Sequence, residues 1–269
     1  MPSLVTDRGV VHYETIGRGR PVVLLHCWLG SWNNWRDSME VLSRSYRVHA
    51  LDFWGFGDSS TQSRYEISDY VAMVDIFMER MGIASAPVLG HSMGGSVSLA
   101  LALARPNRVQ KVVIVGSPVV GSSLSFWLQV AGIQPFGWLA WNVPFFLPIA
   151  MKLYSPWIAR DHRRWYKMFM DDIDRITMQS FSYSIGSLAK MDLQPRLGEF
   201  TMPVLGIFGK KDNLVNPNQA DLVNQMPSGR SVVFEHSRHY PMLDESERFY
   251  STLLEFLAEP HIASRVEEL

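Results

Sequence analysis

Two hydrophobic patterns alternate near both ends of the chain. Short apolar or β-branched runs are typical of parallel strands that are buried on both faces, and segments with apolar residues at helical spacing separate them. We predict strands at residues 10–15, 22–26, 46–53, 86–89, 111–115, 203–208 and 232–235. We predict helices at residues 68–81, 95–104, 217–226 and 245–258. This alternation predicts an α/β fold with a doubly wound, mostly parallel sheet.

The helix predicted at residues 68–81 shows the helical spacing clearly. Its apolar positions form one face, made of Val71, Val74, Phe77, Met78 and Met81. Ser68 stands at the start, where a serine hydroxyl can bond the free backbone N–H groups of the first turn. We therefore expect Ser68 to be the N-cap of this helix.

The alternation stops between residues 119 and 194, where helix-like stretches rich in aromatic residues replace the buried strands. We predict that residues 119–194 form a helical cap inserted into a core domain made of residues 1–118 and 195–269. Residues 112–151 contain no charged residue, but prolines and glycines interrupt the run and exclude a single membrane-spanning helix. Packing of the cap on the sheet is therefore favoured over contact with a membrane surface, which stays an alternative.

Charge and cysteine content narrow the class of protein. The 269 residues carry a formal net charge of −1 and the pI is about 6.7, so nucleic acid is not an expected partner. The one cysteine, Cys27, excludes an internal disulfide and fits a reducing compartment. The N-terminus lacks the pattern of a signal peptide, so we expect a cytoplasmic protein. The sequence leaves the oligomeric state open, because an apolar cap could equally be a dimer surface or a substrate lid.

The pentapeptide Gly90-His91-Ser92-Met93-Gly94 lies between a predicted strand and a predicted helix. It has the form Gly-x-Ser-x-Gly, and strand, sharp turn and helix are the context of a nucleophile elbow. The serine of such a turn lies in strained backbone, and the flanking glycines let strand and helix approach closely. We therefore predict that Ser92 is a catalytic nucleophile.

Candidates for a base and an orienting acid follow Ser92 along the chain. Asp212 and His239 each lie just beyond a predicted strand. Because ligands bind at the carboxyl edge of open α/β sheets, we expect these side chains to meet there. Asp212 would hold the tautomer of His239, and His239 would deprotonate Ser92. His236 is an alternative base, but it lies nearer the strand, where we expect local packing to hold its side chain.

Acyl transfer also needs an oxyanion hole, which supplies N–H donors to the tetrahedral intermediate. One candidate is the backbone N–H of Met93, at the start of the helix. The backbone N–H of Trp28, in the loop after an early strand, is the second. We expect His26 and Gly30 to support this loop and Cys27 to be a small filler, since nothing near Cys27 marks a paired base.

Residues 52–59, Asp-Phe-Trp-Gly-Phe-Gly-Asp-Ser, follow another predicted strand. Their glycines lack the spacing of phosphate-binding and dinucleotide-binding loops, so we expect a turn that supports the site. No group of His, Cys and carboxylate residues has the spacing of metal ligands. We therefore expect neither a metal nor a cofactor.

Together these motifs resemble those of the α/β-hydrolase family, in its carboxylesterase-like branch with a helical cap. The resemblance covers nearly the whole chain and rests on residues 26–30, 52–59, 90–95 (Gly-His-Ser-Met-Gly-Gly), 209–212 (Gly-Lys-Lys-Asp) and 238–242 (Arg-His-Tyr-Pro-Met). It implies that Ser92, Asp212 and His239 form a catalytic triad and that Trp28 and Met93 supply the oxyanion amides. Cys27 departs from the family, which usually has glycine there; a positive φ at this position would strain a cysteine.

The resemblance implies a serine hydrolase that cleaves a carboxylic ester through an acyl-enzyme. The apolar cap favours a small ester with an apolar acyl or alcohol group. Serine at position 92 argues against haloalkane dehalogenases and epoxide hydrolases of this fold, which use an aspartate there. Two alternatives stay open: a carbon–carbon bond hydrolase that acts on a diketone with the same triad, and a small-molecule receptor with slow turnover.

Overall fold

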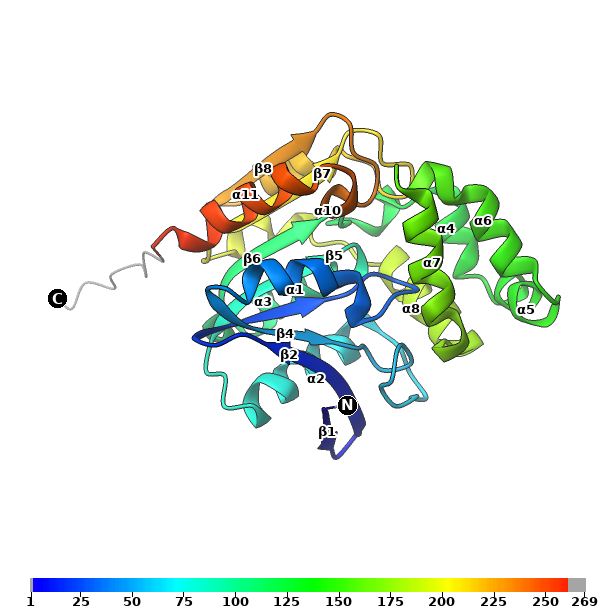
Figure 1. Cartoon of the computed structure of the whole chain (residues 1–269), viewed down its shortest axis with the longest axis horizontal. Helices are drawn as coiled ribbons and strands as arrows, with labels where there is room; N and C mark the ends of the chain where they lie inside the picture. The colour runs from blue at the N-terminus through cyan, green and yellow to red at the C-terminus, as the bar shows by residue number, and fades with distance from the viewer. Residues whose placement is uncertain (1, 261–269) are drawn as a thin grey trace.

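A mostly parallel sheet forms the centre of the protein (Figure 1). The computed structural model describes residues 2–260, and within them eight strands lie in the order β1-β2-β4-β3-β5-β6-β7-β8. The strands are β1 (Ser3–Thr6), β2 (Gly9–Ile16), β3 (Arg20–Leu25), β4 (Tyr46–Leu51), β5 (Ala86–His91), β6 (Val109–Val115), β7 (Val204–Gly209) and β8 (Gly229–Phe234). β2 pairs antiparallel with β1 and β4, and the other neighbours are parallel. The predicted fold class is confirmed.

Helices cover both faces of this sheet. On one face α1 (Arg36–Leu42) contacts α11 (Ser246–Ala258), and on the other α2 (Ile67–Arg80) contacts α3 (Met93–Ala104). α9 (Gln219–Val223) packs on β7 and β8, and the single turn α10 (Pro241–Asp244) precedes α11. β1 and α1 were not predicted; both are short elements.

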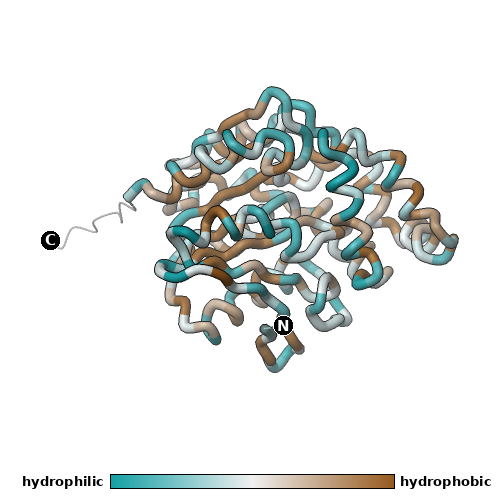
Figure 2. Tube along the Cα trace, viewed as in Figure 1, coloured by the Kyte–Doolittle hydropathy of each residue, from teal (hydrophilic) through white to brown (hydrophobic). Residues whose placement is uncertain are grey.

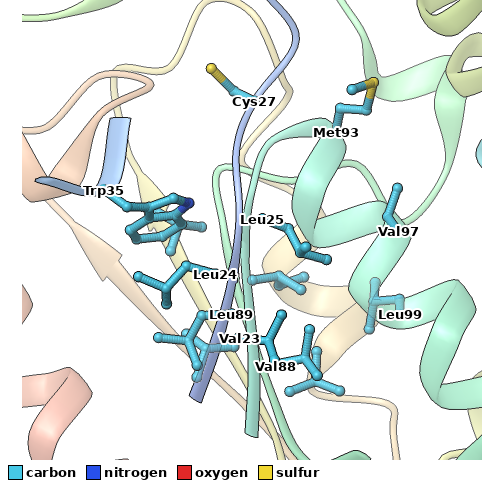
Figure 3. Close-up of a cluster of buried hydrophobic side chains, with 14 of the residues drawn as sticks. Val23, Leu24, Leu25, Cys27, Trp35, Val88, Leu89, Met93, Val97 and Leu99 are labelled. Atoms are coloured by element: carbon cyan, nitrogen blue, oxygen red, sulfur yellow. The ribbon is translucent and has the colours of Figure 1, made fainter. Parts of the chain in front are cut away.

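The core is built on the alternation of side chains along the central strands. Figure 2 shows these strands as a hydrophobic band in the middle of the trace. In Figure 3, Leu24 and Leu89 lie on the side of Trp35, whereas Leu25 lies on the side of α3 with Met93. All five side chains are buried. Because burying one such side chain is worth about 1.5–3 kcal/mol, these strands hold their carboxyl ends firmly in place.

The start of α2 differs from the prediction. The helix begins at Ile67, and Glu66 is its N-cap. The backbone N–H of Glu66 donates to Asp69 Oδ2 at 3.1 Å, whereas Ser68 Oγ contacts the Glu66 carboxylate at 3.4 Å. The Asp69 carboxylate, three residues after the N-cap, accepts from the free backbone N–H of Glu66, which Ser68 does not reach from inside the helix.

A run of helices between β6 and β7 lies beyond the carboxyl ends of the parallel strands, on the right of Figure 1. They are α4 (Phe126–Ala131), α5 (Gln134–Asn142), α6 (Phe146–Ile158), α7 (His162–Asp172) and α8 (Met178–Ala189). An isolated bridge joins Val120 to Asp192, near the two ends of this segment. The segment is helical as expected, and its division from the core as a cap stays a prediction. None of the helices in residues 2–260 is long and apolar enough to cross a membrane.

Candidate active site

Ser92 lies at the tight turn between β5 and α3. Its backbone has φ 52° and ψ −118°, a conformation that a non-glycine residue rarely adopts. Its N–H donates to the Val115 carbonyl of β6 at 2.8 Å, which fixes the turn to the neighbouring strand. Ser92 is thereby held above the carboxyl ends of β5 and β6.

The two glycines of the pentapeptide are required by backbone contacts. A Cβ at Gly90 would lie 2.1 Å from the Gly94 carbonyl carbon. A Cβ at Gly94 would lie 2.3 Å from the Leu25 carbonyl oxygen of β3. Both contacts are with backbone, which cannot rotate away, so the turn depends on the absence of side chains here.

We expect Gly94→Ala to lower the free energy of unfolding by about 2–3 kcal/mol, because the methyl group overlaps the β3 backbone. Urea unfolding measures the change. Gly198→Ala is the matched control, since a Cβ there meets nothing within 4 Å, and we expect a change of at most about 0.5 kcal/mol. Equal unfolding midpoints for the two variants would contradict this account of the turn.

Asp212 and His239 are joined by a hydrogen bond. Their atoms His239 Nδ1 and Asp212 Oδ2 lie 2.7 Å apart, and both side chains are buried. Asp212 follows β7, and its other oxygen, Oδ1, accepts from the backbone N–H groups of Leu214 and Val215 at 2.8 and 3.1 Å. Three donors thus fix the carboxylate, which leaves His239 Nε2 as the nitrogen that can accept a proton. Gly116, with φ 53°, leaves room for this pair, because its Cβ would lie 3.1 Å from the His239 carbonyl oxygen.

The backbone of His239 is held from two sides. His91 Nε2 lies 2.9 Å from the His239 carbonyl oxygen, and the two rings lie 4.8 Å apart. Burial lowers the pKa of His91 well below its usual value, so the ring is neutral and Nε2 is the donor. The His239 N–H donates to the Ile158 carbonyl at the end of α6, at 3.0 Å. The sequence gives no signal for this role of His91 except its place inside the pentapeptide.

His236, the alternative base, is exposed rather than locally packed. Its backbone N–H donates to Glu245 Oε2 at 3.1 Å. It does not line the cavity that contains Ser92 and His239. The geometry therefore favours His239.

The loop after β3 is organised by His26. Its Nδ1 lies 2.7 Å from the Cys27 carbonyl oxygen, and its Nε2 accepts from the Phe53 N–H at 2.9 Å. Nδ1 therefore carries the proton, and burial lowers the pKa of the ring. Cys27 does not have a positive φ; in this loop the positive φ is at Leu29, with φ 61°. Cys27 is therefore not in the conformation that would strain it.

The two candidate oxyanion donors come from this loop and from the elbow. Met93 is the first residue of α3, where backbone N–H groups have no acceptor inside the helix. Trp28 lines the same cavity as Ser92, and its Nε1 donates to the Phe181 carbonyl of α8 at 3.0 Å. A Cβ at Gly30 would lie 1.8 Å from Asn34 Oδ1, so a side chain at this position would displace the Asn34 amide.

Cys27 is a buried thiol between polar partners. Its Sγ lies 3.1 Å from the Tyr240 hydroxyl and 3.5 Å from Asn34 Oδ1. Burial raises the pKa of the thiol to about 12. It therefore stays protonated at neutral pH, which fits a filler rather than a nucleophile.

The loop at residues 52–59 is tied together by Asp52. Asp52 Oδ1 accepts from the Trp32 N–H at 2.7 Å, and Oδ2 accepts from the Asp58 N–H at 3.0 Å. His12 Nδ1 lies 2.7 Å from Oδ2. Potential metal-ligating atoms of His12, Asp52 and Asp58 lie within 4.8 Å of one another, a grouping that sequence spacing did not reveal. These hydrogen bonds already use both Asp52 oxygens. Asp52 therefore joins the loop at residues 52–59 to Trp32, which follows the loop of Trp28.

A cavity of about 310 Å³ connects the candidate residues with the inserted helices. Ser92, His239 and Trp28 lie on the side of the sheet. The opposite wall is mostly apolar and includes Leu128, Phe136, Phe146, Leu147, Met151 and Ile185. Such a cavity suits a small substrate with an apolar part.

The outer surface of the same helices is also apolar. Large side chains with half or more of their area exposed include Phe126, Trp127, Ile133, Trp138, Phe145, Ile149, Leu153 and Trp157. The inserted helices therefore have two apolar faces, one toward the cavity and one toward solvent.

Asp172, the last residue of α7, was not predicted as part of the site. It is 2% exposed and lines the cavity. Ser31 Oγ donates to its Oδ1 at 2.8 Å. Burial raises the pKa of Asp172 to about 7, against the smaller lowering effect of the Ser31 hydrogen bond. In the sequence it lies among other charged residues of a predicted cap segment, with nothing to mark it.

Comparisons with known proteins agree with this architecture. The family described as alpha/beta hydrolase fold matches residues 20–246. The pimeloyl-[acyl-carrier protein] methyl ester esterase of Vibrio campbellii is 30% identical over 257 residues, which cover 92% of this chain and 98% of that protein. Among solved structures, a thermophilic esterase from Thermogutta terrifontis has a TM-score of 0.84 at 20% identity, covering 97% of this chain and 98% of that one. The enol-lactonase from Burkholderia xenovorans LB400 has a TM-score of 0.83 at 21% identity, covering 96% and 100%.

Proposed function

Because the chain belongs to the α/β-hydrolase fold family, we propose that it is a serine hydrolase that cleaves a carboxylic ester with an apolar acyl or alcohol group. One observation carries the proposal: Ser92, in strained backbone, and His239, which is hydrogen-bonded to Asp212, line one mostly apolar cavity. The esterase from Vibrio campbellii, which the chain matches over 98% of its length, supports an ester as the substrate.

The reaction proceeds through an acyl-enzyme on Ser92. His239 Nε2 takes the proton of the Ser92 hydroxyl while Oγ attacks the ester carbonyl. Asp212 accepts from Nδ1–H and stabilises the imidazolium that forms. The imidazolium then gives the proton to the leaving alcohol as the C–O bond breaks. Water, deprotonated by His239 in the same way, attacks the acyl group and frees Ser92.

The negative charge of each tetrahedral intermediate is stabilised by the backbone N–H groups of Met93 and Trp28. Met93 adds the favourable dipole of the α3 N-terminus. The hydrogen bond from the Trp28 indole to Phe181 supports this role, because it fixes the loop that carries the second donor. The helices of residues 119–194 act as a cap that excludes water from the apolar part of the substrate.

Stopped-flow hydrolysis of nitrophenyl esters tests the proposal. We expect a burst of nitrophenol, stoichiometric with the protein, followed by steady turnover, because the acyl-enzyme forms in a separate step. A series of esters with acyl chains from acetyl to octanoyl shows, from the change of kcat/KM with chain length, which chain the apolar cavity accepts best.

The same experiment tests the two alternatives, a carbon–carbon bond hydrolase and a receptor with slow turnover. A ring-cleavage diketone tests carbon–carbon hydrolysis, and faster turnover of the diketone than of any ester would contradict the proposal. Ligand binding with negligible turnover of every substrate would favour a receptor instead. The acyl-carrier-protein methyl ester for which the relative is named completes the panel.

A further inference from the structure

The cavity wall contains a carboxyl group that the proposed reaction does not use. Within the described residues, Asp172 is the one carboxylate among the side chains that line this cavity. Asp172 has no ion pair in residues 2–260, and Arg175, one turn further on, pairs with Asp58 at 3.4 Å instead. A buried carboxyl group without a cation is costly, so its presence in an apolar wall needs a reason.

The hydrogen-bonding capacity of Asp172 is only partly used. Ser31 supplies one donor, at 2.8 Å to Oδ1. A carboxyl group has about four acceptor positions on its two oxygens, and a proton to donate when it is neutral. A ligand with a polar group can therefore gain a hydrogen bond here that an apolar chain cannot make.

Asn34 adds a second polar group to the lining of the same cavity. It is buried, lines the cavity, and its Oδ1 is engaged by the Cys27 thiol at 3.5 Å. Its amide nitrogen carries two donors. Burial raises the pKa values of Cys27 and Tyr240, and among the smaller causes Asp172 also raises both.

Resting on the proposed ester hydrolysis, we infer that Asp172 and Asn34 form a subsite that hydrogen-bonds a hydroxyl group of the substrate. A hydroxyl is both donor and acceptor, so it matches a carboxyl oxygen and an amide N–H together. Ser31 and the 3-10 helix Trp32–Trp35 follow the loop of Trp28, and both Asn34 and Asp172 line the cavity of Ser92. The preferred substrate is thus an apolar ester with one hydroxyl group away from the ester bond.

Matched ester pairs test this inference. The pairs are methyl hexanoate with methyl 3- and 6-hydroxyhexanoate, and butyl hexanoate with 4-hydroxybutyl hexanoate. We expect kcat/KM to favour the hydroxylated ester of at least one pair by about 10- to 100-fold, the effect of one or two buried hydrogen bonds. We expect Asp172→Leu to bring the ratio of kcat/KM between the hydroxylated and the unsubstituted ester to about one. We expect Asp172→Asn to keep part of the preference, because an amide oxygen still accepts from a hydroxyl.

Controls separate a subsite from a merely structural link between α7 and Ser31. Asp174→Asn changes an exposed aspartate two residues away. We expect this variant to show the same ratio of kcat/KM between the two esters as the unaltered protein. A structural role of Asp172 would change stability but leave the ratio unchanged, and that result would overturn the subsite. Preference for an amino ester over the hydroxy ester, lost in Asp172→Asn, would also overturn it and indicate a cation site.

A binding measurement keeps the test independent of hydrolysis. In Ser92→Ala, tryptophan fluorescence reports binding, since Trp28 and Trp165 line the cavity. We expect the hydroxylated ester of the preferred pair to bind more tightly, and Asp172→Leu in the same background to remove the difference. Equal affinities would overturn the subsite, whereas failure of the unaltered protein to hydrolyse any ester would overturn the proposed function alone.

Discussion

Ser92→Ala is expected to lower kcat/KM for ester hydrolysis by about 10⁴- to 10⁶-fold, the loss found when the nucleophile of such a triad is removed. The alanine keeps the backbone of the elbow and removes the one atom that attacks the carbonyl. The residual rate comes from the oxyanion donors and substrate binding. The nitrophenol burst is expected to disappear together with steady turnover.

An exposed serine provides the matched control for this variant. Ser122 lies at the start of the inserted segment and is exposed. We expect Ser122→Ala to hydrolyse the esters within about twofold of the unaltered protein, since surface substitutions have small effects. Circular dichroism and thermal unfolding verify that both variants fold. Turnover by folded Ser92→Ala at a tenth or more of the original rate would contradict the proposed mechanism.

Asp172→Asn is expected to change how stability depends on pH. Burial raises the pKa of Asp172 from 3.8 to about 7 in the folded protein. A group whose pKa is raised by folding contributes stability below its unfolded pKa, and this contribution is lost as pH rises through the folded pKa. The stability of the unaltered protein therefore falls relative to the asparagine variant between about pH 4 and pH 7. At 1.36 kcal/mol per pKa unit, the fall is about 4 kcal/mol.

Urea unfolding of both proteins from pH 4 to pH 8 measures this effect. Subtracting the two curves removes the titration of the other groups, because asparagine retains the hydrogen bond from Ser31 without a titrating proton. The charged groups that act on Asp172 are Asp52 and Asp171, which raise its pKa, and Arg175, which lowers it. A difference that stays constant over this range would contradict the raised pKa of Asp172.

The sequence was sufficient to predict β2 to β8 and the positions of Ser92, Asp212 and His239 beyond the carboxyl ends of strands. Continuous apolar runs identify buried strands, and the carboxyl ends of parallel strands meet at one edge. Asp212 and His239 lie in the loops after β7 and β8, which are neighbours in the sheet, so the order of the strands brings the two loops together. Their catalytic roles stay predictions that the variants above test.

Other features depend on packing between distant segments. Ser31 and Asp172 are 141 residues apart, so no local pattern indicates their hydrogen bond. The sequence could not locate the positive φ of this loop, which is at Leu29, because the path of the loop also depends on contacts with Phe53 and Asn34. The N-cap of α2 was misplaced because serine is the commoner capping residue and Glu66 acts here through Asp69.

The hydrogen bond between the His239 N–H and the end of α6 has a mechanical consequence. Two further bonds accompany it: Arg238 Nη1 donates to the Ala159 carbonyl at 3.0 Å, and the Arg160 N–H donates to Asp244 Oδ1 at 2.8 Å. These three bonds fix residues 158–160 to the segment that contains His239. A rotation of α6 about residues 158–160 would therefore displace His239. We therefore expect substrate to enter by movement of α4, α5 and the first turns of α6, which lie before these hydrogen bonds in the chain. His239, the proposed general base, would then keep its position while the cavity opens.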